Sequence, residues 1–288
     1  LLKSWADEGK RPSDLILLMF TDAEMPEMDG YRLTAEVRGD ERMSDLFVAL
    51  NTSLSGSFNE AMVEKVGCNR FISKFQPDML SDIMNISENL SILNWERYQN
   101  WSIPFHSDSA RQAMYTFTGD TYTGFDIATL SKADIKFCQQ HTRILSGLYG
   151  LLRPMDLIMP YRLEMGTRLD HGNGNDLYAF WGDIITKTLN RELSSHKQRV
   201  IINCASVEYF KVIDMSKLEA VVVTPVFKEI KKGKPKIVSF FAKKARGAMA
   251  RYIVQNRIHN PANIHDFDHD GYCYNPSLST PNSPVFTR

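Results

Sequence analysis

Three polar residues, Asp22, Thr52 and Lys74, each stand at or just beyond the end of a short apolar segment. Buried parallel strands end in this way, and their carboxyl ends meet at one edge of an open α/β sheet. The three segments would thus bring a carboxylate, a hydroxyl and an ammonium group to the same edge of the sheet. These residue types at that edge predict a polar functional site. For Asp22 alone, the alternative is an aspartate that caps a helix.

A second chemistry is indicated by the segment 228–251, which holds nine Lys and Arg residues and one acid, Glu229, for a net charge of +8. Its first half predicts a hairpin with Gly233 and Pro235 at the turn, and its second half predicts an amphipathic helix. Lysines on both elements could follow one phosphate backbone, so binding should weaken with salt and show little sequence preference. The residues predicted to contact DNA here are Lys231, Lys232, Lys234, Lys243, Lys244, Arg246 and Arg251. The alternative is a solvated charged face without a partner.

The element LSGLYG, residues 145–150, contains Gly147 and Gly150 and is flanked by Arg143 and Arg153. Glycines at this spacing could let backbone amides approach a DNA phosphate, as in the turn of a helix-hairpin-helix. The same residues fit a simple helix cap, which the six residues alone favour.

A third group of polar residues could converge on an anion or a small ligand in a cleft. An enzyme would need a nucleophile with a base, and Ser206 near Glu208 lacks a convincing histidine. We therefore predict no enzymatic activity and expect buried hydrogen-bonded pairs, such as Arg162 with Glu164 or a neighbour. The predicted cleft residues are Tyr161, Arg162, Glu164, Trp181, Asn203 and Glu208.

Composition and charge place these groups in two domains. The chain is 43% hydrophobic and 24% charged, which is typical of a soluble globular protein. Residues 1–82 carry a net charge of −6 and residues 83–288 a net charge of +6, so we predict a domain boundary at residue 82. The first domain should contain strands at 15–20, 46–50 and 70–73, and the second a helix over 131–145.

The chain shows neither a membrane span nor a metal motif. The longest apolar run near its start, 15–20, is far too short to cross a bilayer, and no secretory signal opens the sequence. Four cysteines lie far apart without metal-ligand spacing, and the His and Asp residues of 265–270 are typical of a solvated turn. We therefore expect a cytoplasmic protein with no membrane partner and no metal centre.

The segments TDAEMPEMDG, ALNTSLSG and FISKFQPD resemble the receiver domain of response regulators, especially that of the chemotaxis coupling protein CheV. The resemblance implies that Asp22 is phosphorylated by a histidine kinase and that Thr52 and Lys74 contact the phosphoryl group. Receiver domains hold Mg²⁺ partly with an acidic pair on a first strand, which is missing here. Asp22 and the carbonyl of Glu24 are too few ligands for Mg²⁺, so we expect no firmly bound cofactor and poor phosphorylation.

Five segments of the chain are similar to the YaaA peroxide stress family: LSGLYGLLRPMDLIMPYRLEMGTRL, FWGDI, INCASVEYF, AKKARG and FDHDGYCY. The resemblance covers residues 83–288. It implies a cytoplasmic α/β protein that binds duplex DNA through a basic cleft with a helix-hairpin-helix and limits peroxide damage. The family's opening strand, with its Ser-Pro-Ala-Lys-Thr motif, is absent from this chain.

The expected fold is therefore α/β, with a partial receiver-like parallel fragment followed by a YaaA-like domain that contains a helix-hairpin-helix. The expected function is sequence-tolerant binding of double-stranded DNA in the peroxide stress response. A phosphorelay or chemotaxis protein switched at Asp22 is the main alternative. A third interpretation is that the junction joins two neighbouring reading frames by error. The sequence predicts no oligomeric state.

Overall fold

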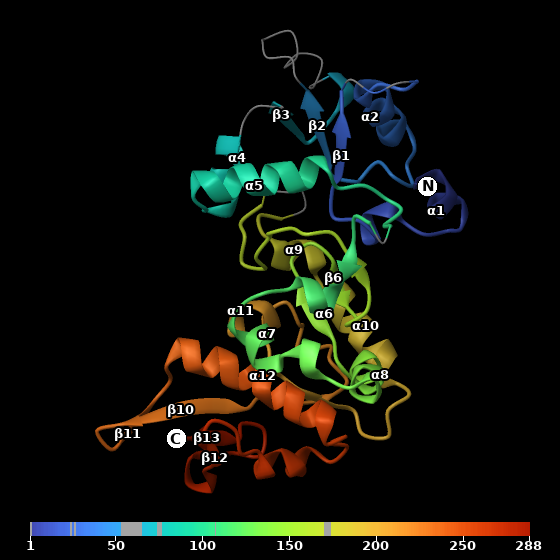
Figure 1. Ribbon diagram of the computed structural model, residues 1–288. Coiled ribbons are helices and arrows are strands. Elements are labelled where there is room, and N and C mark those ends of the chain that lie inside the picture. Colours follow the sequence, from blue (N-terminus) through green and yellow to red (C-terminus); the bar gives the residue numbers. More distant parts are fainter. Residues whose placement is uncertain are drawn as a thin grey trace. The chain divides into compact units, whose positions relative to one another are not determined.

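A computed structural model describes residues 2–23, 25, 27–52, 65–73, 77–106, 108–169 and 174–288. The chain packs as two compact units (Figure 1). Unit 1 comprises Leu1–Trp101, Gly147–Tyr149 and Tyr161–Ile184, and unit 2 comprises Ser102–Ser146, Gly150–Pro160 and Ile185–Arg288. Residue 82 lies within unit 1. The sign of the net charge changes near residue 82, but the division into compact units follows packing and need not fall at the same residue. The domain boundary at residue 82 therefore stays a prediction.

Unit 1 contains a parallel sheet of β1 (Met19–Asp22), β2 (Val48–Thr52) and β3 (Arg70–Ser73), in that order. The prediction of a strand over 15–20 was wrong at its start. The 3-10 helix η1 (Pro12–Asp14) ends against Leu15, which is 48% exposed, so the chain becomes extended only at Met19. The prediction for β3 is confirmed at both ends.

Among the described residues of unit 1, the helices are α1 (Leu2–Asp7), α2 (Gly30–Gly39), α4 (Pro77–Met84), α5 (Glu88–Gln99) and α9 (Leu177–Trp181). Asp29 caps α2 by accepting a hydrogen bond from the amide of Arg32. Ala6 of α1 and Val37 of α2 are buried in one cluster with Val48 of the sheet, so apolar burial fixes both helices on the strands.

Unit 2 contains α6 (Ala113–Thr116), α7 (Asp120–Phe125), α8 (Lys132–His141), α11 (Val207–Phe210) and α12 (Ser239–Gln255), and α10 (Ile184–Leu193) begins at the last residue of unit 1. Short 3-10 helices lie at η2 (Ile127–Thr129), η3 (Pro261–Asp266) and η4 (Pro276–Leu278). Ser131 begins α8 with a capping box to Asp134. The helix predicted over 131–145 ends early, because Thr142 is already extended and leads into a strand.

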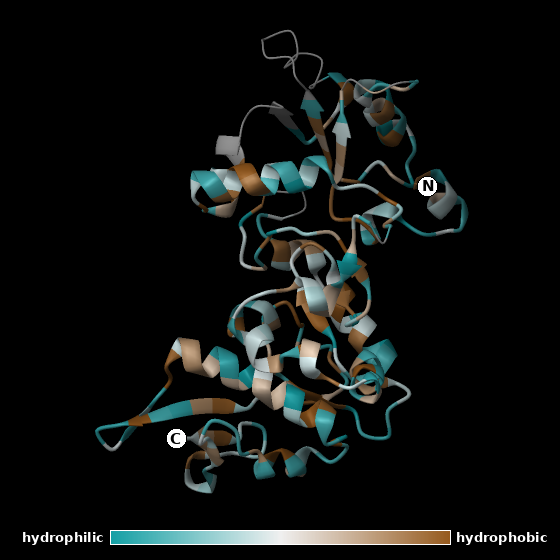
Figure 2. Cartoon of the chain, in the orientation of Figure 1, coloured by the Kyte–Doolittle hydropathy of each residue, from teal (hydrophilic) through white to brown (hydrophobic). Residues whose placement is uncertain are grey.

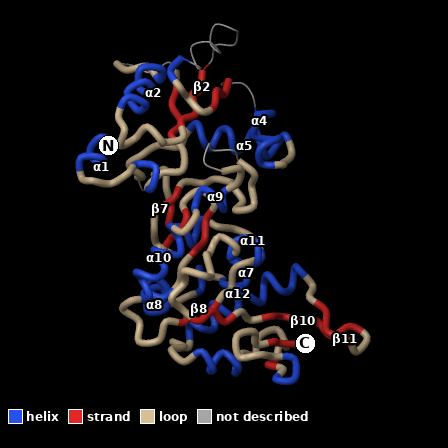
Figure 3. Tube along the Cα trace, turned by 180° about the vertical axis from the view of Figure 1, so that it is seen from behind, coloured by secondary structure: helices blue, strands red, loops and turns tan. Residues whose placement is uncertain are grey.

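Four small sheets complete unit 2 (Figure 3). The largest has the order β11 (Lys234–Lys236), β10 (Val226–Lys231), β13 (Val285–Thr287), β12 (Cys273–Tyr274). The others pair β4 (Arg111–Gln112) with β7 (Leu157–Ile158), β5 (Ile144–Ser146) with β6 (Gly150–Leu152), and β8 (Val200–Ile202) with β9 (Val221–Val223). No helix in the described part of the chain is long and apolar enough to cross a membrane.

The core of unit 2 forms where α12 packs on the largest sheet. Phe227 of β10 and Phe286 of β13 stack with their ring centroids 5.4 Å apart, and Met249 of α12 is fully buried in the same cluster. Figure 2 shows α12 with hydrophobic and hydrophilic residues alternating along its length. Helix α12 and strand β10 are therefore held by one aromatic core.

Helix α7 crosses α12 at two glycines. A methyl group on Gly124 would lie 2.0 Å from the carbonyl oxygen of Lys244, and one on Gly247 would lie 1.8 Å from that of Thr121. No real side chain tolerates such distances. The absence of a side chain at both positions therefore lets the two backbones touch.

The element LSGLYG does not join two helices. Residues 145–150 belong to the antiparallel hairpin of β5 and β6, in which Ser146 pairs with Gly150. Both interpretations of these residues, the helix-hairpin-helix turn and the helix cap, were therefore wrong. The helix before them ends at His141, so the backbone amides of Gly147 and Gly150 do not stand at the start of a helix.

Candidate nucleic-acid interface

The clearest cationic feature is the hairpin of β10 and β11, and we call its residues 229–237 the arm. Strand β13 accompanies β10 as far as Ile230, whose amide donates to the carbonyl of Arg288 over 2.7 Å. Beyond that point β10 pairs only with β11. The arm therefore ends as a two-stranded ribbon that extends from the rest of unit 2 in both views (Figures 1 and 3).

The turn of the arm consists of Lys232 and Gly233, which have φ angles of 52° and 73°. A two-residue loop with both φ angles positive is the type I′ turn that suits the twist of a hairpin. The predicted hairpin and the place of Gly233 in its turn are thus confirmed, whereas Pro235 lies in β11 opposite Ile230. Proline is tolerated there because β11 is an edge strand.

One face of the arm is cationic. Residues that lie opposite each other in an antiparallel ribbon share a face, and Lys231 pairs with Lys234 while Glu229 pairs with Lys236. These lysines and Lys232 at the turn are exposed. Within the described residues, none of the four forms an ion pair, so their charges are available to a partner.

The single acid of the arm is occupied within the protein. Glu229 accepts hydrogen bonds from the hydroxyl of Tyr272 and, over 2.8 Å, from Nε of Arg288. The guanidinium of Arg288 also lies over the rings of Phe241 and Tyr272, at 4.5 and 4.6 Å from their centroids. Burial raises the pKa of Tyr272, which keeps its hydroxyl protonated as a donor. Glu229 therefore anchors the base of the arm and does not offset the charge at its tip.

Helix α12 presents fewer cations than its sequence indicates. Lys243 is exposed, but Lys244 lies 3.6 Å from a carboxylate oxygen of Asp270. Arg251 donates to the carbonyl oxygens of Phe125 and Asp126, at 3.0 and 2.7 Å, and so closes the end of α7. Lys244 and Arg251 were both predicted to contact DNA, but each is engaged by a partner within unit 2.

Arg246, also on α12, is directed into unit 2. Its Nε is buried without a hydrogen-bond partner among the described residues, and burial lowers the pKa of its guanidinium. Burial likewise raises the pKa of the nearby Cys204 thiol to about 12, although the charge of Arg246 opposes that rise. Arg246 is therefore half-buried with its Nε in the interior, which sequence periodicity alone did not reveal.

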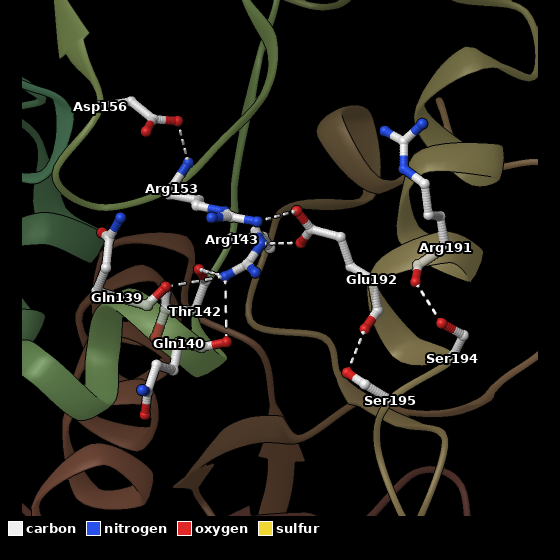
Figure 4. A network of polar contacts seen from close by, with 10 residues as sticks. All are labelled: Gln139, Gln140, Thr142, Arg143, Arg153, Asp156, Arg191, Glu192, Ser194 and Ser195. Atoms are coloured by element: carbon white, nitrogen blue, oxygen red, sulfur yellow. Dashed lines mark hydrogen bonds and ion pairs between the residues drawn. The ribbon is translucent and has the colours of Figure 1, made fainter.

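The two arginines predicted beside LSGLYG meet one carboxylate (Figure 4). Nε of Arg143 contacts Glu192, and Arg153 contacts the other carboxylate oxygen of Glu192 over 3.0 Å. Arg143 also donates to the carbonyl of Thr142 over 2.7 Å and to two further carbonyls at the end of α8. Burial alone would raise the pKa of Glu192, but the two guanidinium groups outweigh it and lower the pKa. This network joins α8, β6 and α10, and only Arg153 remains half exposed.

The predicted cleft residues fall in different units. In unit 1, Arg162 lies 2.8 Å from Glu164, so the predicted pair forms, but its side chains are 42% and 53% exposed and the expectation of a buried pair was wrong. Trp181 is buried and donates to the carbonyl of Gly147 over 3.0 Å, and Tyr161 packs edge-on against Tyr149. These are packing and pairing contacts within one unit.

The remaining cleft residues lie in unit 2. The buried Asn203 accepts from the amide of Ala205 over 3.0 Å, and Glu208 is exposed on α11. Ser206 caps α11 by accepting from the amide of Tyr209 over 3.2 Å. The hydroxyl of Ser206, the only candidate nucleophile in the sequence analysis, therefore serves as a helix cap.

The predicted phosphorylation site is only partly described. Asp22 ends β1 and pairs in register with Asn51, and Thr52 ends β2 and pairs with Ser73. Lys74 lies outside the described residues, as does Glu24. Sequence reasoning missed Asn51, whose side chain is buried at this edge and donates to Gln99 over 3.3 Å. Among the described residues, no three His, Cys, Asp or Glu side chains gather as a metal site would require.

Comparison with known proteins places the sequence in one family. The family model described as peroxide stress protein YaaA matches residues 50–278. A UPF0246 protein of Hahella chejuensis is 53% identical over 213 residues, which cover 74% of this chain and 83% of that protein. Another, from Paraburkholderia phytofirmans, is 50% identical over 219 residues, which cover 75% and 84%.

A solved receiver domain of a histidine kinase from Syntrophus aciditrophicus overlaps 31% of this chain and 61% of its own, with 24% identity and a TM-score of 0.20. A likeness at that level supports no conclusion about the first part of the chain. The family match, in contrast, covers most of the sequence, and the chain belongs to the YaaA family of peroxide stress proteins.

Proposed function

We propose that this peroxide stress protein acts in the cytoplasm by binding double-stranded DNA with little sequence preference. The observation that carries the proposal is the set of four exposed lysines on the arm that form no ion pair with any described residue. Duplex DNA carries one phosphate charge per roughly 1.7 Å of its axis, so closely spaced lysines on a protruding ribbon can neutralise several phosphates together. Lys243, exposed on the adjoining α12, adds to the same segment.

We infer binding and not catalysis. Ser206, the one residue considered as a nucleophile, caps a helix, and the cleft residues Arg162 and Glu164 pair with each other. The helix-hairpin-helix implied by the family resemblance plays no part in the proposal. Contacts come instead from lysine side chains, which reach phosphates without reading bases.

A salt series on the double variant Lys231→Gln with Lys234→Gln tests the proposal. Each phosphate contact contributes about −0.9 to the slope of log affinity against log salt, so losing two contacts should make the slope shallower by about 2. Affinity for a mixed-sequence duplex, measured by fluorescence anisotropy, should fall accordingly at low salt. The matched control is Lys132→Gln with Lys136→Gln on α8, which removes two exposed lysines elsewhere in unit 2.

An unchanged slope in the arm variant, or equal losses in both variants, would contradict the proposal. A wild-type affinity that does not respond to salt would remove its electrostatic basis altogether.

The second candidate is a phosphorelay role with Mg²⁺ and a histidine kinase, favoured by the place of Asp22 at the carboxyl end of β1. We expect little phosphorylation, because few oxygen ligands for Mg²⁺ can be named around Asp22. Incubation with acetyl phosphate and Mg²⁺, followed by intact-mass measurement, checks this expectation. Stoichiometric phosphate uptake that is lost in Asp22→Ala would favour the phosphorelay role.

A further inference from the structure

The face of the arm opposite its paired lysines is apolar. Ile230 pairs with Pro235 on that face and is 45% exposed, and Ile237, directly after β11, is 61% exposed. Aliphatic side chains gathered at one exposed place and bordered by polar residues are typical of a binding surface. The arm therefore has two different faces, and binding of phosphates by its lysines would explain only one of them.

A partner of the whole arm must offer anions and apolar surface at once. An anionic membrane does so, but a flat surface contacts one side of a ribbon, and interfacial anchors usually rely on long amphipathic helices. A groove of a nucleic acid duplex encloses an inserted ribbon on both sides. The opposite directions of the two faces thus favour a groove.

We propose that the arm is a wedge that enters the minor groove of duplex DNA and bends it. The lysine face holds the phosphates along the groove, while Ile230, Pro235 and Ile237 press against a base step and partly unstack it. Apolar residues inserted in this way kink DNA by about 20–90°. This inference rests on the proposed function and adds to it the manner of binding and the deformation of the partner.

The composition of the arm agrees with such a wedge. Residues 229–237 contain no Asn, Gln or Arg, so lysine is the only side chain of the arm that pairs commonly with purine edges. Preference would then come from how easily a sequence bends, so flexible TA and CA steps should be favoured over stiff A-tracts.

The experiment measures bending and affinity separately on the full chain. Energy transfer between dyes at the two ends of a short duplex with a central TA step reports the bend, and anisotropy reports the affinity. Ile230→Thr with Ile237→Thr removes the apolar face, keeps the β-branched shape of both side chains and leaves every lysine in place. Lys231→Gln with Lys234→Gln is the matched comparison.

We expect wild-type protein to raise the energy transfer between the dyes. The isoleucine variant should bind with an unchanged salt slope but should raise the energy transfer only slightly. The lysine variant should have a shallower slope, with the rise retained at saturating protein. Netropsin, which occupies the minor groove, should compete with wild-type protein. Circular dichroism and thermal melting establish that both variants are folded, and the netropsin result does not depend on any variant.

The outcomes separate the two proposals. If wild-type protein fails to bind the duplex, the proposed function is wrong and the wedge falls with it. If it binds but does not raise energy transfer, if the isoleucine variant bends DNA as wild type does, or if netropsin fails to compete, the wedge alone is overturned. Binding of the arm to vesicles of anionic lipid in preference to DNA, lost in the isoleucine variant, would assign the apolar face to a membrane.

Discussion

At the scale of single residues, this chain separates cations that are free to bind a partner from cations that hold its own structure. Lys231 and Arg251 stand in the same basic segment, yet Arg251 donates to carbonyls more than a hundred residues away in sequence, at the end of α7. A buried or capped guanidinium cannot leave its partners without a cost in stability. Counting charges in a sequence therefore overestimates the number of cations available to DNA.

Glu192 provides a test of this distinction, since it neutralises Arg143 and Arg153. Glu192→Gln keeps the shape but removes the charge, and we expect the free energy of unfolding at pH 7 to fall by about 1–3 kcal/mol. Urea unfolding followed by circular dichroism measures it. The control is Glu219→Gln, which breaks an exposed pair with Arg199 and should cost under about 1 kcal/mol.

The pH dependence of this pair has a defined sign. The pKa of Glu192 is lower in the folded protein, so its stabilisation is complete above the ordinary pKa of a glutamate and is lost as the pH falls through the lowered value. Wild type and Glu192→Gln should consequently converge in stability as the pH is lowered from 7 to 3. A difference that persists undiminished at pH 3 would show that the charge of Glu192 is not the cause.

At the scale of elements, the crossing of α7 and α12 decides how the arm is supported, because β10 and β11 lead directly into α12. Gly247→Ala should force the two helices apart, since the new methyl group would meet the backbone carbonyl of Thr121. We expect a loss of about 1–3 kcal/mol, the usual effect of overpacking. Thermal or urea unfolding provides the measurement.

Gly39→Ala serves as the control for Gly247→Ala. Gly39 is the last residue of helix α2, and a methyl group there would meet nothing within 4 Å. That substitution should leave stability unchanged or raise it slightly, because alanine favours helix. If both substitutions cost the same, the close contact at the crossing would not explain the loss.

At the scale of the whole molecule, the sequence predicted local features better than long-range ones. The turn at Gly233, the cap at Ser131 and the strand 70–73 were predicted because their signals lie within a few residues. The strand at 15–20 was misplaced because a nearby 3-10 helix delays it, which an apolar run does not reveal.

In the candidate site, too, local features were predicted and long-range contacts were not. The exposed lysines of the arm were predicted from composition, and the apolar Ile230, Pro235 and Ile237 between charged residues could have revealed its second face. The burial of Arg246 and the anchoring of Glu229 by Tyr272 and Arg288 could not, because these contacts join segments far apart in sequence. The hairpin at LSGLYG was missed because glycines mark turns between strands as readily as turns between helices.

The left-handed turn at Lys232 and Gly233 has one more consequence. Because the arm tip is exposed and stands clear of the aromatic core, trypsin-like proteases should reach the bonds after Lys231 and Lys232 early, whereas Pro235 shields the bond after Lys234. A chain cut at the tip would keep its folded core and lose the continuous ribbon. Cleavage there should therefore abolish binding through the arm while the rest of unit 2 stays folded. A ligand bound to the ribbon should slow this cleavage.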